Sequence, residues 1–242
     1  MQKLMSRMRA AMEKYDMIAP GDTVAVGVSG GKDSLALLAA LHEMQRYYPV
    51  PYTLKAISVD PCFFGEPTDF SAVEALCADM GVEYVIRRTE LYRVIFETRK
   101  EANPCSLCAR MRRGILHNMC REIGANKLAL GHHMDDAAET FMMNLLSGGT
   151  LGSFRPVTYL SRKEITVIRP MIFAREKDVT RAAHQRGLPV INSPCPMDKE
   201  SEREQIKNLL RDLEKTYPAL NEKIVGAMEK AGMEGWKTGS EF

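Results

Sequence analysis

The sequence has no long hydrophobic run, no internal repeat and no low-complexity segment. No stretch approaches the roughly 18 consecutive apolar residues of a membrane-spanning helix, and the first residues, MQKLMSRMRAAMEKY, lack the continuous apolar region of a signal peptide. We therefore expect a cytoplasmic protein with no membrane contact. Because the cytoplasm keeps thiols reduced, the six cysteines are not expected to form a disulfide framework. Metal binding or catalysis is the expected role for any cysteines that cluster.

No charge of one sign dominates the chain, whose formal net charge is +2 at pH 7. Hydrophobic residues make up 45% and charged residues 26% of the 242 positions, which excludes a disordered protein and allows one large domain. The charge is uneven, because between residues 86 and 113 eight basic residues outnumber three acidic ones. Such a local excess predicts contact with a polyanion. The eight basic residues are Arg87, Arg88, Arg93, Arg99, Lys100, Arg110, Arg112 and Arg113.

Short apolar runs alternate with longer helical patterns over most of the chain. The predicted strands are 23–28, 54–59, 83–87 and 127–131, and the predicted helices are 34–47, 69–80, 106–123 and 136–146. Strands that are apolar almost throughout and alternate with helices indicate an α/β fold, with a parallel sheet covered by helices on both faces. Further predicted elements are an amphipathic helix at 1–16, a fifth strand at 164–168, a helix at 175–186 and a charged helical tail beyond residue 194.

The stretch SGGKDS, residues 29–34, directly follows the first predicted strand, at the end of the sheet where ligands bind in open parallel folds. Gly30 and Gly31 allow backbone N–H groups to turn toward an anion, and the following helix adds the positive end of its dipole. Lys32 supplies positive charge and the two serines supply hydroxyl groups. A tight turn alone would account for the glycines but not for the other four residues, so we predict a phosphate-binding loop.

The stretch ALGHHMDDAAET lies at the end of the fourth predicted strand and opens a helix. Asp135 and Asp136 therefore lie where a magnesium ion that bridges phosphates can be held, with His132 and His133 beside them. The alternative is helix capping, because the helix dipole stabilises acidic residues in a first turn. We favour the metal site because the pair falls at the same edge of the sheet as the phosphate loop.

Three cysteines form a candidate ligand set. Cys105 and Cys108 make a C-x-x-C pair ahead of a predicted helix, a spacing that serves in redox couples, zinc sites and iron–sulfur clusters. Cys195, between two prolines in a polar turn, is the natural third thiol. Structural zinc needs four ligands and no fourth is evident there, whereas three thiolates suit a cubane cluster with one open iron. Cys77 and Cys120 lie in helical patterns and are predicted to be core residues.

The motifs resemble those of a known family. SGGKDS is not a Walker loop, because Val26 stands where that pattern needs glycine and Asp33 where it needs serine or threonine. It resembles instead the signature of the PP-loop ATP pyrophosphatases, and GHHMDD resembles their second motif. The stretches CSLCARMRRGIL, LLSGG, VIRPM, REKDV and NLLRDLEKTYP narrow the resemblance to the tRNA 2-thiocytidine synthetases, between residues 20 and 230. Asp198 stands where many of these relatives have a second cysteine.

The resemblance implies an adenine nucleotide α hydrolase-like fold and an ATP-dependent tRNA-cytidine sulfurtransferase. Such an enzyme adenylates the C2 oxygen of a cytidine, releases pyrophosphate, and replaces the oxygen with sulfur delivered at a [4Fe–4S] cluster. Adenylation helps because AMP is an easy leaving group, and an iron without a protein ligand can hold hydrosulfide. The implied cofactors are ATP, Mg²⁺ and the cluster. The implied partners are tRNA and a sulfur donor, either a cysteine desulfurase or free sulfide, and formation of a homodimer stays open.

Each implied role falls on residues of the matching motifs. The residues implied in nucleotide binding are Ser29, Gly30, Gly31, Lys32, Asp33, Ser34, Ser58, Asp60, Gly131 and His132. Those implied in catalysis are Lys32, Asp33, Asp135 and Asp136, and the last two are also implied as magnesium ligands. The implied cluster ligands are Cys105, Cys108 and Cys195, and the implied RNA contacts are Arg110, Arg112, Arg113 and Arg169. A solvated helix face is the alternative for the first three arginines, and a strand end is the alternative for Arg169.

We expect an amphipathic helix at 1–20, a catalytic PP-loop domain at 21–190 and a helical tail at 191–238 that carries Cys195. The last four residues, 239–242, are interpreted as a cloning remnant. Two other functions stay open. The enzyme could carry sulfur as a cysteine persulfide without a cluster, or act on another base or a small molecule. A non-catalytic ATP- and RNA-binding protein could instead use the thiols for structural zinc.

Overall fold

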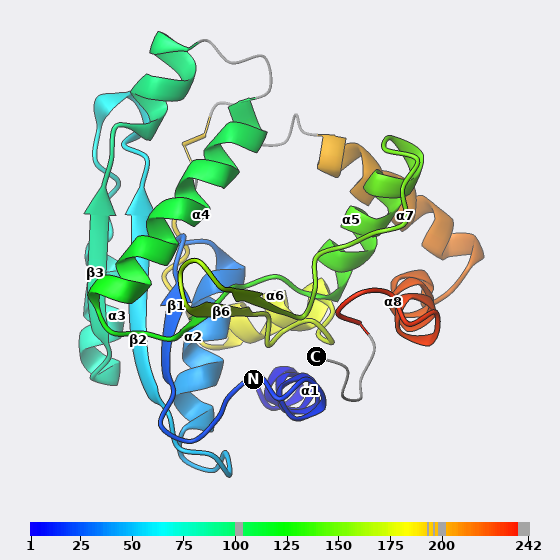
Figure 1. Cartoon of the computed structure of the whole chain (residues 1–242), viewed down its shortest axis with the longest axis horizontal. Coiled ribbons are helices and arrows are strands. Elements are labelled where there is room, and N and C mark those ends of the chain that lie inside the picture. The colour runs from blue at the N-terminus through cyan, green and yellow to red at the C-terminus, as the bar shows by residue number, and fades with distance from the viewer. Residues whose placement is uncertain (100–103, 193, 196, 198–201, 237–242) are drawn as a thin grey trace.

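A computed structural model describes residues 1–99, 104–192, 194, 195, 197 and 202–236. Lys100 of the basic segment, Asp198 beyond Cys195 and residues 239–242 lie outside the described residues. The centre of the fold is a six-stranded sheet with the order β3-β2-β1-β4-β6-β5 (Figure 1). Its strands are β1 (Thr23–Gly27), β2 (Thr53–Asp60), β3 (Glu83–Arg88), β4 (Lys127–Ala129), β5 (Val157–Leu160) and β6 (Ile165–Ile168).

All neighbouring strands are parallel except β5, which pairs antiparallel with β6 at the edge of the sheet. The expected α/β fold with a parallel sheet is therefore confirmed, and the predicted fifth strand is β6. The sequence did not predict β5, because its four residues are half-buried or exposed and show no apolar run. Its turn back into β6 contains Glu164 in a left-handed conformation with φ of 54°.

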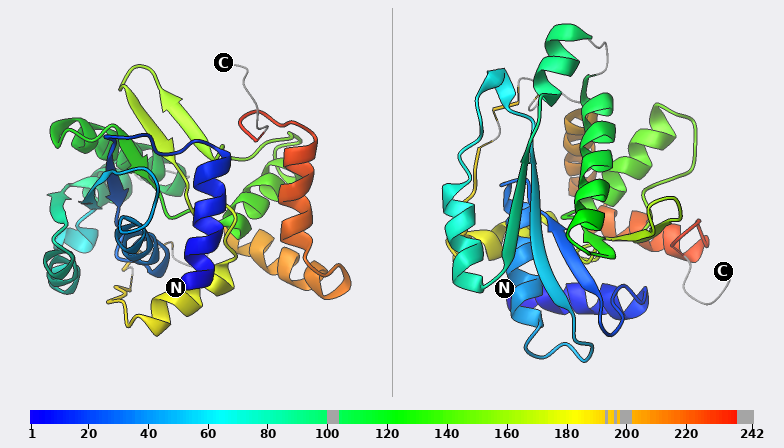
Figure 2. Two further views of the ribbon diagram at one scale, coloured as in Figure 1. Left: turned by 90° about the horizontal axis from the view of Figure 1, so that it is seen from below. Right: turned by 60° about the vertical axis from the view of Figure 1, so that its left-hand side comes forward.

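Helices cover both faces of the sheet. They are α1 (Gln2–Lys14), α2 (Lys32–Met44), α3 (Ser71–Met80), α4 (Pro104–Glu122), α5 (Met134–Leu146), α6 (Glu176–Gln185), α7 (Glu202–Thr216) and α8 (Leu220–Lys230), with short helical turns η1 (Phe63–Gly65) and η2 (Arg93–Thr98). Within β1 the side chains alternate, so that Val24 and Val26 join one apolar core and Ala25 joins another. The first core includes α1, α2, α3 and α6, and the second includes α4, on the opposite side of the sheet (Figure 2).

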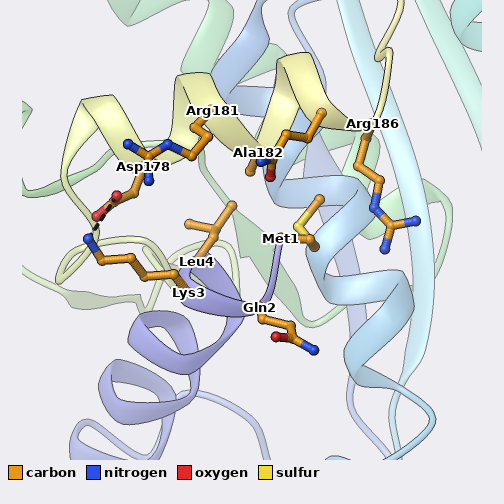
Figure 3. Close-up of a pocket in the computed structure, with 9 residues that line it drawn as sticks. Met1, Gln2, Lys3, Leu4, Asp178, Arg181, Ala182 and Arg186 are labelled. Carbon is orange, nitrogen blue, oxygen red and sulfur yellow. Dashed lines mark hydrogen bonds and ion pairs between the residues drawn. The ribbon is translucent and has the colours of Figure 1, made fainter.

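The N-terminal segment forms the predicted amphipathic helix, with Leu4, Met8 and Met12 buried on one side. This α1 packs against α2 and α6. Figure 3 shows the pocket where the start of α1 meets α6, and there Lys3 Nζ lies 3.0 Å from Asp178 Oδ1. The ion pair and the apolar stripe together fix α1 to the first core.

The charged tail is helical, as predicted, and its α7 and α8 pack on α5 at one side of the molecule (Figure 1). A small third core of Ala138, Ile206 and Leu210 joins α5 to α7. Cys77 and Cys120 are buried in the first and second cores, which confirms their predicted place. None of the helices in the described part of the chain is long and apolar enough to cross a membrane.

Candidate active site

The SGGKDS loop leaves the carboxyl end of β1 and leads into α2, whose first residue is Lys32. Its two serines hold it in shape. Ser34 Oγ accepts a hydrogen bond from the Ser29 backbone N at 3.1 Å and donates to the Gly31 carbonyl at 2.9 Å. The Gly31 N–H in turn donates to Ser29 Oγ at 3.3 Å. The loop conformation is therefore stabilised by the loop's own hydrogen bonds.

Two glycines let other segments approach this loop closely. Gly30 has a φ of 82°, and a Cβ there would lie 3.0 Å from the side chain of Ile191, whose backbone N donates to the Gly30 carbonyl at 2.9 Å. A Cβ at Gly131, between β4 and α5, would lie 3.1 Å from the Ser34 backbone N. The segment that leads to Cys195 and the GHHMDD segment thus both abut the phosphate loop.

Lys32 lies between two carboxylates. Its Nζ donates to Asp33 Oδ1 at 2.8 Å and to Glu176 Oε1 at 3.0 Å. Burial opposes the charge on Lys32, but these two carboxylates outweigh it and raise the pKa of the ammonium group. Burial also opposes ionisation of Glu176, but hydrogen bonds and charges from Lys207 and Lys32 lower its pKa to about 2. The loop lysine is therefore charged and held in place by ion pairs.

His133 and Asp136 form a reciprocal cap at the start of α5. His133 Nδ1 accepts from the Asp136 backbone N at 3.3 Å, and Asp136 Oδ2 accepts from the His133 backbone N at 2.9 Å. His133 Nε2 lies 3.9 Å from Asp33 Oδ1, which brings the two motifs together. Helix capping and a place at the site are therefore compatible for Asp136.

Asp135 points elsewhere. Its Oδ1 accepts from Arg175 Nε at 3.0 Å and from Asn221 Nδ2 at 2.8 Å, and its Oδ2 accepts from the Glu176 backbone N at 2.6 Å. These bonds tie α5 to α6 and α8. Of the two paired aspartates, Asp136 lines the cavity described below and Asp135 does not.

The Asp135 network predicts a large stability effect. Arg175 also pairs with Glu214 at 3.0 Å and with Glu222, so Arg175→Met leaves the buried Asp135 carboxylate without its cation. We expect a loss of about 3 kcal/mol, because removing one partner of a mostly buried pair is costly while the exposed partners contribute little. The melting temperature measured by circular dichroism should fall by about 10 °C.

The control for this prediction is Arg9→Met. Arg9 pairs with Glu13 one turn along α1, and both side chains are about half exposed. Loss of such an exposed pair costs little, so the melting temperature should change by no more than about 1–2 °C. Equal losses in the two variants would contradict the structural role of the Arg175 network.

A cavity of 610 Å³ opens at this edge of the sheet, a volume within the range of about 300–1,000 Å³ that is usual for small-ligand sites. Residues of α4 line one side of the cavity, and residues of α5 and α7 line the other. Figure 1 shows α4 opposite α5 and α7. Its lining includes Ser29, Asp33, Ser34, Val59, Ala109, Arg112, Arg113, Leu116, Gly131, His132, Asp136, Thr140, Phe154, Arg169 and Arg203. The phosphate loop, the second motif and the helix that carries the C-x-x-C pair therefore share one cavity.

Arg169 forms part of the cavity wall rather than the outer surface. It is 9% exposed, its guanidinium lies 4.9 Å from the centre of the Phe154 ring, and its Nε donates to His132 Nδ1 at 3.3 Å. Burial lowers the pKa of Arg169 to about 10. Burial and then the charge of Arg169 lower the pKa of His132 to about 4, so His132 is neutral at pH 7. Arg169 therefore lies at the end of a strand, directly after β6, and also lines the cavity.

The other predicted arginines differ in position. Arg112 and Arg113 line the cavity, whereas Arg110 lies on the exposed side of α4. Ser58 and Asp60 are fully buried at the end of β2 and do not line it. The Ser58 hydroxyl bonds to the Val28 carbonyl and the Tyr84 hydroxyl, and Asp60 accepts from the backbone N of Cys62 and of Thr68 and from the Thr68 hydroxyl. Both side chains therefore stabilise the backbone conformation around the end of β2.

The three candidate thiols lie near one another. Burial and the charge of Cys195 raise the pKa of Cys105. Burial raises the pKa of Cys108 as well, with Arg112 opposing and the other two thiols adding to the rise. The length of the chain also limits the distance between Cys195 and the phosphate loop. Cys195 follows Ile191 by four residues, which span at most about 14 Å. Since Ile191 is bonded to Gly30, the third thiol lies close to the phosphate loop.

The donor set suits an iron–sulfur cluster, because three thiolates are soft ligands of the kind that iron–sulfur clusters use. In the part of the chain that the structure describes, no three His, Cys, Asp or Glu side chains are close enough together to hold a metal ion. The three sulfurs therefore lie near one another without being at ligand distance. This fits the raised pKa values of Cys105 and Cys108, because a thiol must lose its proton before it can ligate a metal.

Comparison with known proteins identifies the family. The sequence profile of the PP-loop domain matches residues 2–213. The chain belongs to the PP-loop family. It is 40% identical to the tRNA-cytidine(32) 2-sulfurtransferase of Syntrophotalea carbinolica over 90% of the chain and 85% of the relative, and 35% identical to that of Geobacter sulfurreducens over 94% and 89%. These matches confirm the expected branch of 2-thiocytidine synthetases and the expectation of an enzyme.

A solved structure is also similar to this PP-loop protein. It is the U34-tRNA thiolase NcsA from Methanococcus maripaludis with its [4Fe–4S] cluster, which is 29% identical and has a TM-score of 0.75. The match covers 92% of this chain and 76% of that one. It supports the PP-loop fold over nearly the whole chain.

Sequence reasoning missed several side chains of this PP-loop site. Arg203 on α7 lies 3.4 Å from Asp136 Oδ1 and 3.6 Å from Glu139 Oε2, and donates to the Thr140 hydroxyl at 3.1 Å. Lys207, one turn later, bonds to Glu176. Burial raises the pKa of Glu139 to about 8, although Arg203 opposes the rise. The spacing of the two basic residues on one face of an amphipathic helix was the signal available in the sequence.

Proposed function

We propose that the chain catalyses ATP-dependent thiolation of a tRNA cytidine, first adenylating the C2 oxygen and then replacing it with sulfur. One observation carries the proposal: the phosphate loop, Asp136 and the helix that begins with the C-x-x-C pair line a single cavity of 610 Å³. None of the three cysteines lines the cavity, but Ala109, the neighbour of Cys108 on α4, does, so in this proposal a base bound there lies between the nucleotide and the start of α4. The names of the similar sulfurtransferases and of the similar thiolase support the same reaction class.

In this proposal the nucleotide binds at the junction of β1 and β4 with α2. The residues that hold it are Ser29, Gly30, Gly31, Lys32, Asp33, Ser34, Gly131 and His132. Lys32 and the start of α2 face the pyrophosphate, whose negative charge they stabilise as it leaves. Asp33 and Asp136, which both line the cavity, would hold Mg²⁺, which would offset the negative charge of the phosphates. Asp135 positions this group from behind through Arg175 and Asn221.

The first step forms a bond between the cytosine C2 oxygen and the α-phosphorus of ATP and breaks the bond between the α- and β-phosphates. Pyrophosphate leaves with the electron pair of that bond. Hydrosulfide then adds at C2, AMP departs with the original oxygen and the electron pair of the C2–O bond, and the proton of the hydrosulfide is lost to solvent. The protein's contribution to the first step is position and charge, as in other phosphoryl-transfer sites.

The arginines of α4 face the RNA. Arg112 and Arg113 lie at the cavity, and Arg110 extends the basic surface outside it. Such contacts bind the sugar-phosphate backbone and position it without reading sequence. The target base must be unpaired to enter the cavity, where Arg169 and neutral His132 offer hydrogen-bonding groups.

The thiols of Cys105, Cys108 and Cys195 hold a [4Fe–4S] cluster in this proposal. A cluster held by these three thiolates would have one iron without a protein ligand, and it would supply sulfur to the base at the oxidation level of sulfide. Arg112 lies beside Cys108 and its positive charge favours the thiolate form needed for ligation.

The test uses the full chain, reconstituted with iron and sulfide without oxygen and incubated with ATP, Mg²⁺, sulfide and tRNA. We expect AMP, pyrophosphate and 2-thiocytidine in equal amounts, with the modified nucleoside measured by mass spectrometry of digested tRNA. Replacing ATP by its α,β-methylene analogue should abolish all three products, because the bond to be broken is no longer labile. Thiolated RNA without pyrophosphate, or sulfur in another base, would overturn the proposal.

Arg203 offers a separate prediction about nucleotide binding. It lines the cavity and approaches Asp136 from α7, so Arg203→Ala removes a positive charge close to the phosphates. We expect the KM for ATP to rise about tenfold, the effect of losing one charge-assisted hydrogen bond. The control is Arg211→Ala, on an exposed position of the same helix. A KM that changes equally in both variants would contradict the role of Arg203.

A further inference from the structure

An aromatic cluster lies beyond the carboxyl ends of β2 and β3, outside the cavity. Tyr92 is at its centre. The Tyr92 ring lies 4.9 Å from that of Phe64 and is stacked on Phe96 at 5.2 Å, with an angle of 24° between the planes. Phe63 meets Tyr92 edge-on at 6.0 Å. The rings of Phe64, Tyr92 and Phe96 therefore form a ladder.

At the outer end of this ladder, the loop after β2 keeps the ring of Phe64 exposed to solvent. Phe64 is 59% exposed, whereas the neighbouring Phe63 is buried. Cys62 and Phe64 both adopt left-handed conformations, with φ of 49° and 58°, which are unfavourable for residues with a Cβ. Asp60 fixes the loop by accepting hydrogen bonds from the Cys62 and Thr68 backbones. The exposed ring is thus presented by a rigid scaffold.

The inner end of the ladder lies near α4, the helix that carries Cys105 and Cys108. Phe96 packs in the same apolar cluster as Leu107 and Cys108 of α4. The turn η2 contacts both η1 and α4, and in Figure 1 the loops after β2 and β3 rise next to the start of α4. The aromatic surface therefore continues outward from the part of the fold where sulfur chemistry is proposed.

Exposed arginines lie beside the ladder, although Glu66 and Glu97 on the same segments are exposed as well. Arg88 is exposed at the end of β3, and Arg93 on η2 is 68% exposed. The acid paired with Arg93 is Glu90 at 3.7 Å, and such an exposed pair is weak. Arg88 pairs with Asp60 in the register of β2 and β3, two residues before Cys62 at the start of η1. An aromatic face with cations beside it matches a nucleobase attached to its phosphates.

We propose that Phe64, Tyr92 and Phe96 form a stacking platform for an unpaired RNA base that flanks the modified nucleotide. The proposal rests on the proposed function, because that function supplies the RNA. Every base has a π face, so stacking holds single-stranded RNA with little sequence preference, while Arg88 and Arg93 bind the adjacent phosphates. The platform fixes the path of the loop so that the target base reaches the cavity.

The experiment measures tRNA binding by the reconstituted full chain carrying Phe64→Ala, Phe64→Trp or Arg93→Gln. We expect Phe64→Ala to weaken binding between about fivefold and a hundredfold, the range for losing one stacked base. Its salt dependence should stay unchanged, whereas Arg93→Gln should reduce the slope of log K against log salt by about one. Phe64→Trp should bind as the wild type does, and its tryptophan fluorescence should be quenched by RNA, because the only native tryptophan, Trp236, is fully buried.

The control is Tyr217→Ala, an aromatic residue that is 55% exposed between α7 and α8, on the opposite side of the molecule from η1. It should bind tRNA as the wild type does. Wild-type affinity in Phe64→Ala, or no quenching in Phe64→Trp, overturns the platform and leaves the proposed function intact. A wild-type chain that binds no tRNA overturns both, so the two failures are distinguishable.

Discussion

Asp136→Asn should lower pyrophosphate release at least about a hundredfold, the loss typical of removing one group that stabilises transition-state charge. Asparagine has the same shape as aspartate, and its amide oxygen can still accept the hydrogen bond from the His133 backbone that caps α5. The helix start is therefore preserved while the negative charge that attracts Mg²⁺ is lost. The rate is measured as pyrophosphate formed in the presence of tRNA.

Two further measurements make this prediction specific to the cation. The concentration of Mg²⁺ needed for half-maximal rate should rise in Asp136→Asn, and the iron content should equal that of the wild type, because the thiols are not touched. The matched control is Asp212→Asn, an exposed carboxylate on α7 that should leave the rate unchanged. A variant that releases pyrophosphate at more than about a tenth of the wild-type rate would contradict the assigned role.

Cys195→Ser should have the opposite pattern. Serine replaces a soft sulfur ligand by a hard oxygen, so we expect the bound iron to fall to less than about a third and 2-thiocytidine formation to fall at least about a hundredfold. Pyrophosphate release should stay within about threefold of wild type, because the phosphate loop and Asp136 are unchanged. Iron and acid-labile sulfide are measured after reconstitution without oxygen.

The matched control is Cys62→Ser. Cys62 is also partly exposed, but it lies at the start of η1 and is not one of the three thiols that influence one another. Its iron content should equal that of the wild type. A Cys195→Ser variant that keeps a full cluster would show that the third ligand is wrong, and a colourless wild-type protein that thiolates tRNA would favour the persulfide alternative.

The sheet could be predicted from the sequence because its central strands are buried on both faces. In β1 the residues 24–26 are apolar and buried, and the last five residues of β2 are buried as well, which is typical of parallel strands inside an α/β fold. The edge strand β5 lacks this property, since Tyr159 is 62% exposed and the strand is only four residues long. Its pairing with β6 depends on tertiary contact and left no local signal.

The residues of the candidate site could be predicted where a single motif forms a single loop. They were harder to predict where the direction of a side chain depends on its position around a helix. Successive residues on a helix point about 100° apart, so Asp135 and Asp136 face different neighbours although the motif treats them as a pair. Arg203 contacts Asp136 although the two residues are 67 positions apart in the sequence. Only the packing of α7 on α5 brings the two together, and no spacing in the sequence encodes that contact.

The contact between Gly30 and Ile191 has a mechanical consequence. Since the backbone of the phosphate-gripping turn is hydrogen-bonded to the segment that leads to Cys195, neither can shift alone. A bulkier residue at Gly30 would displace Ile191 and with it the anchor of the third thiol. In the proposed reaction, activation of the base and delivery of sulfur would therefore be coupled through this backbone contact, and a substitution of Gly30 should impair both steps.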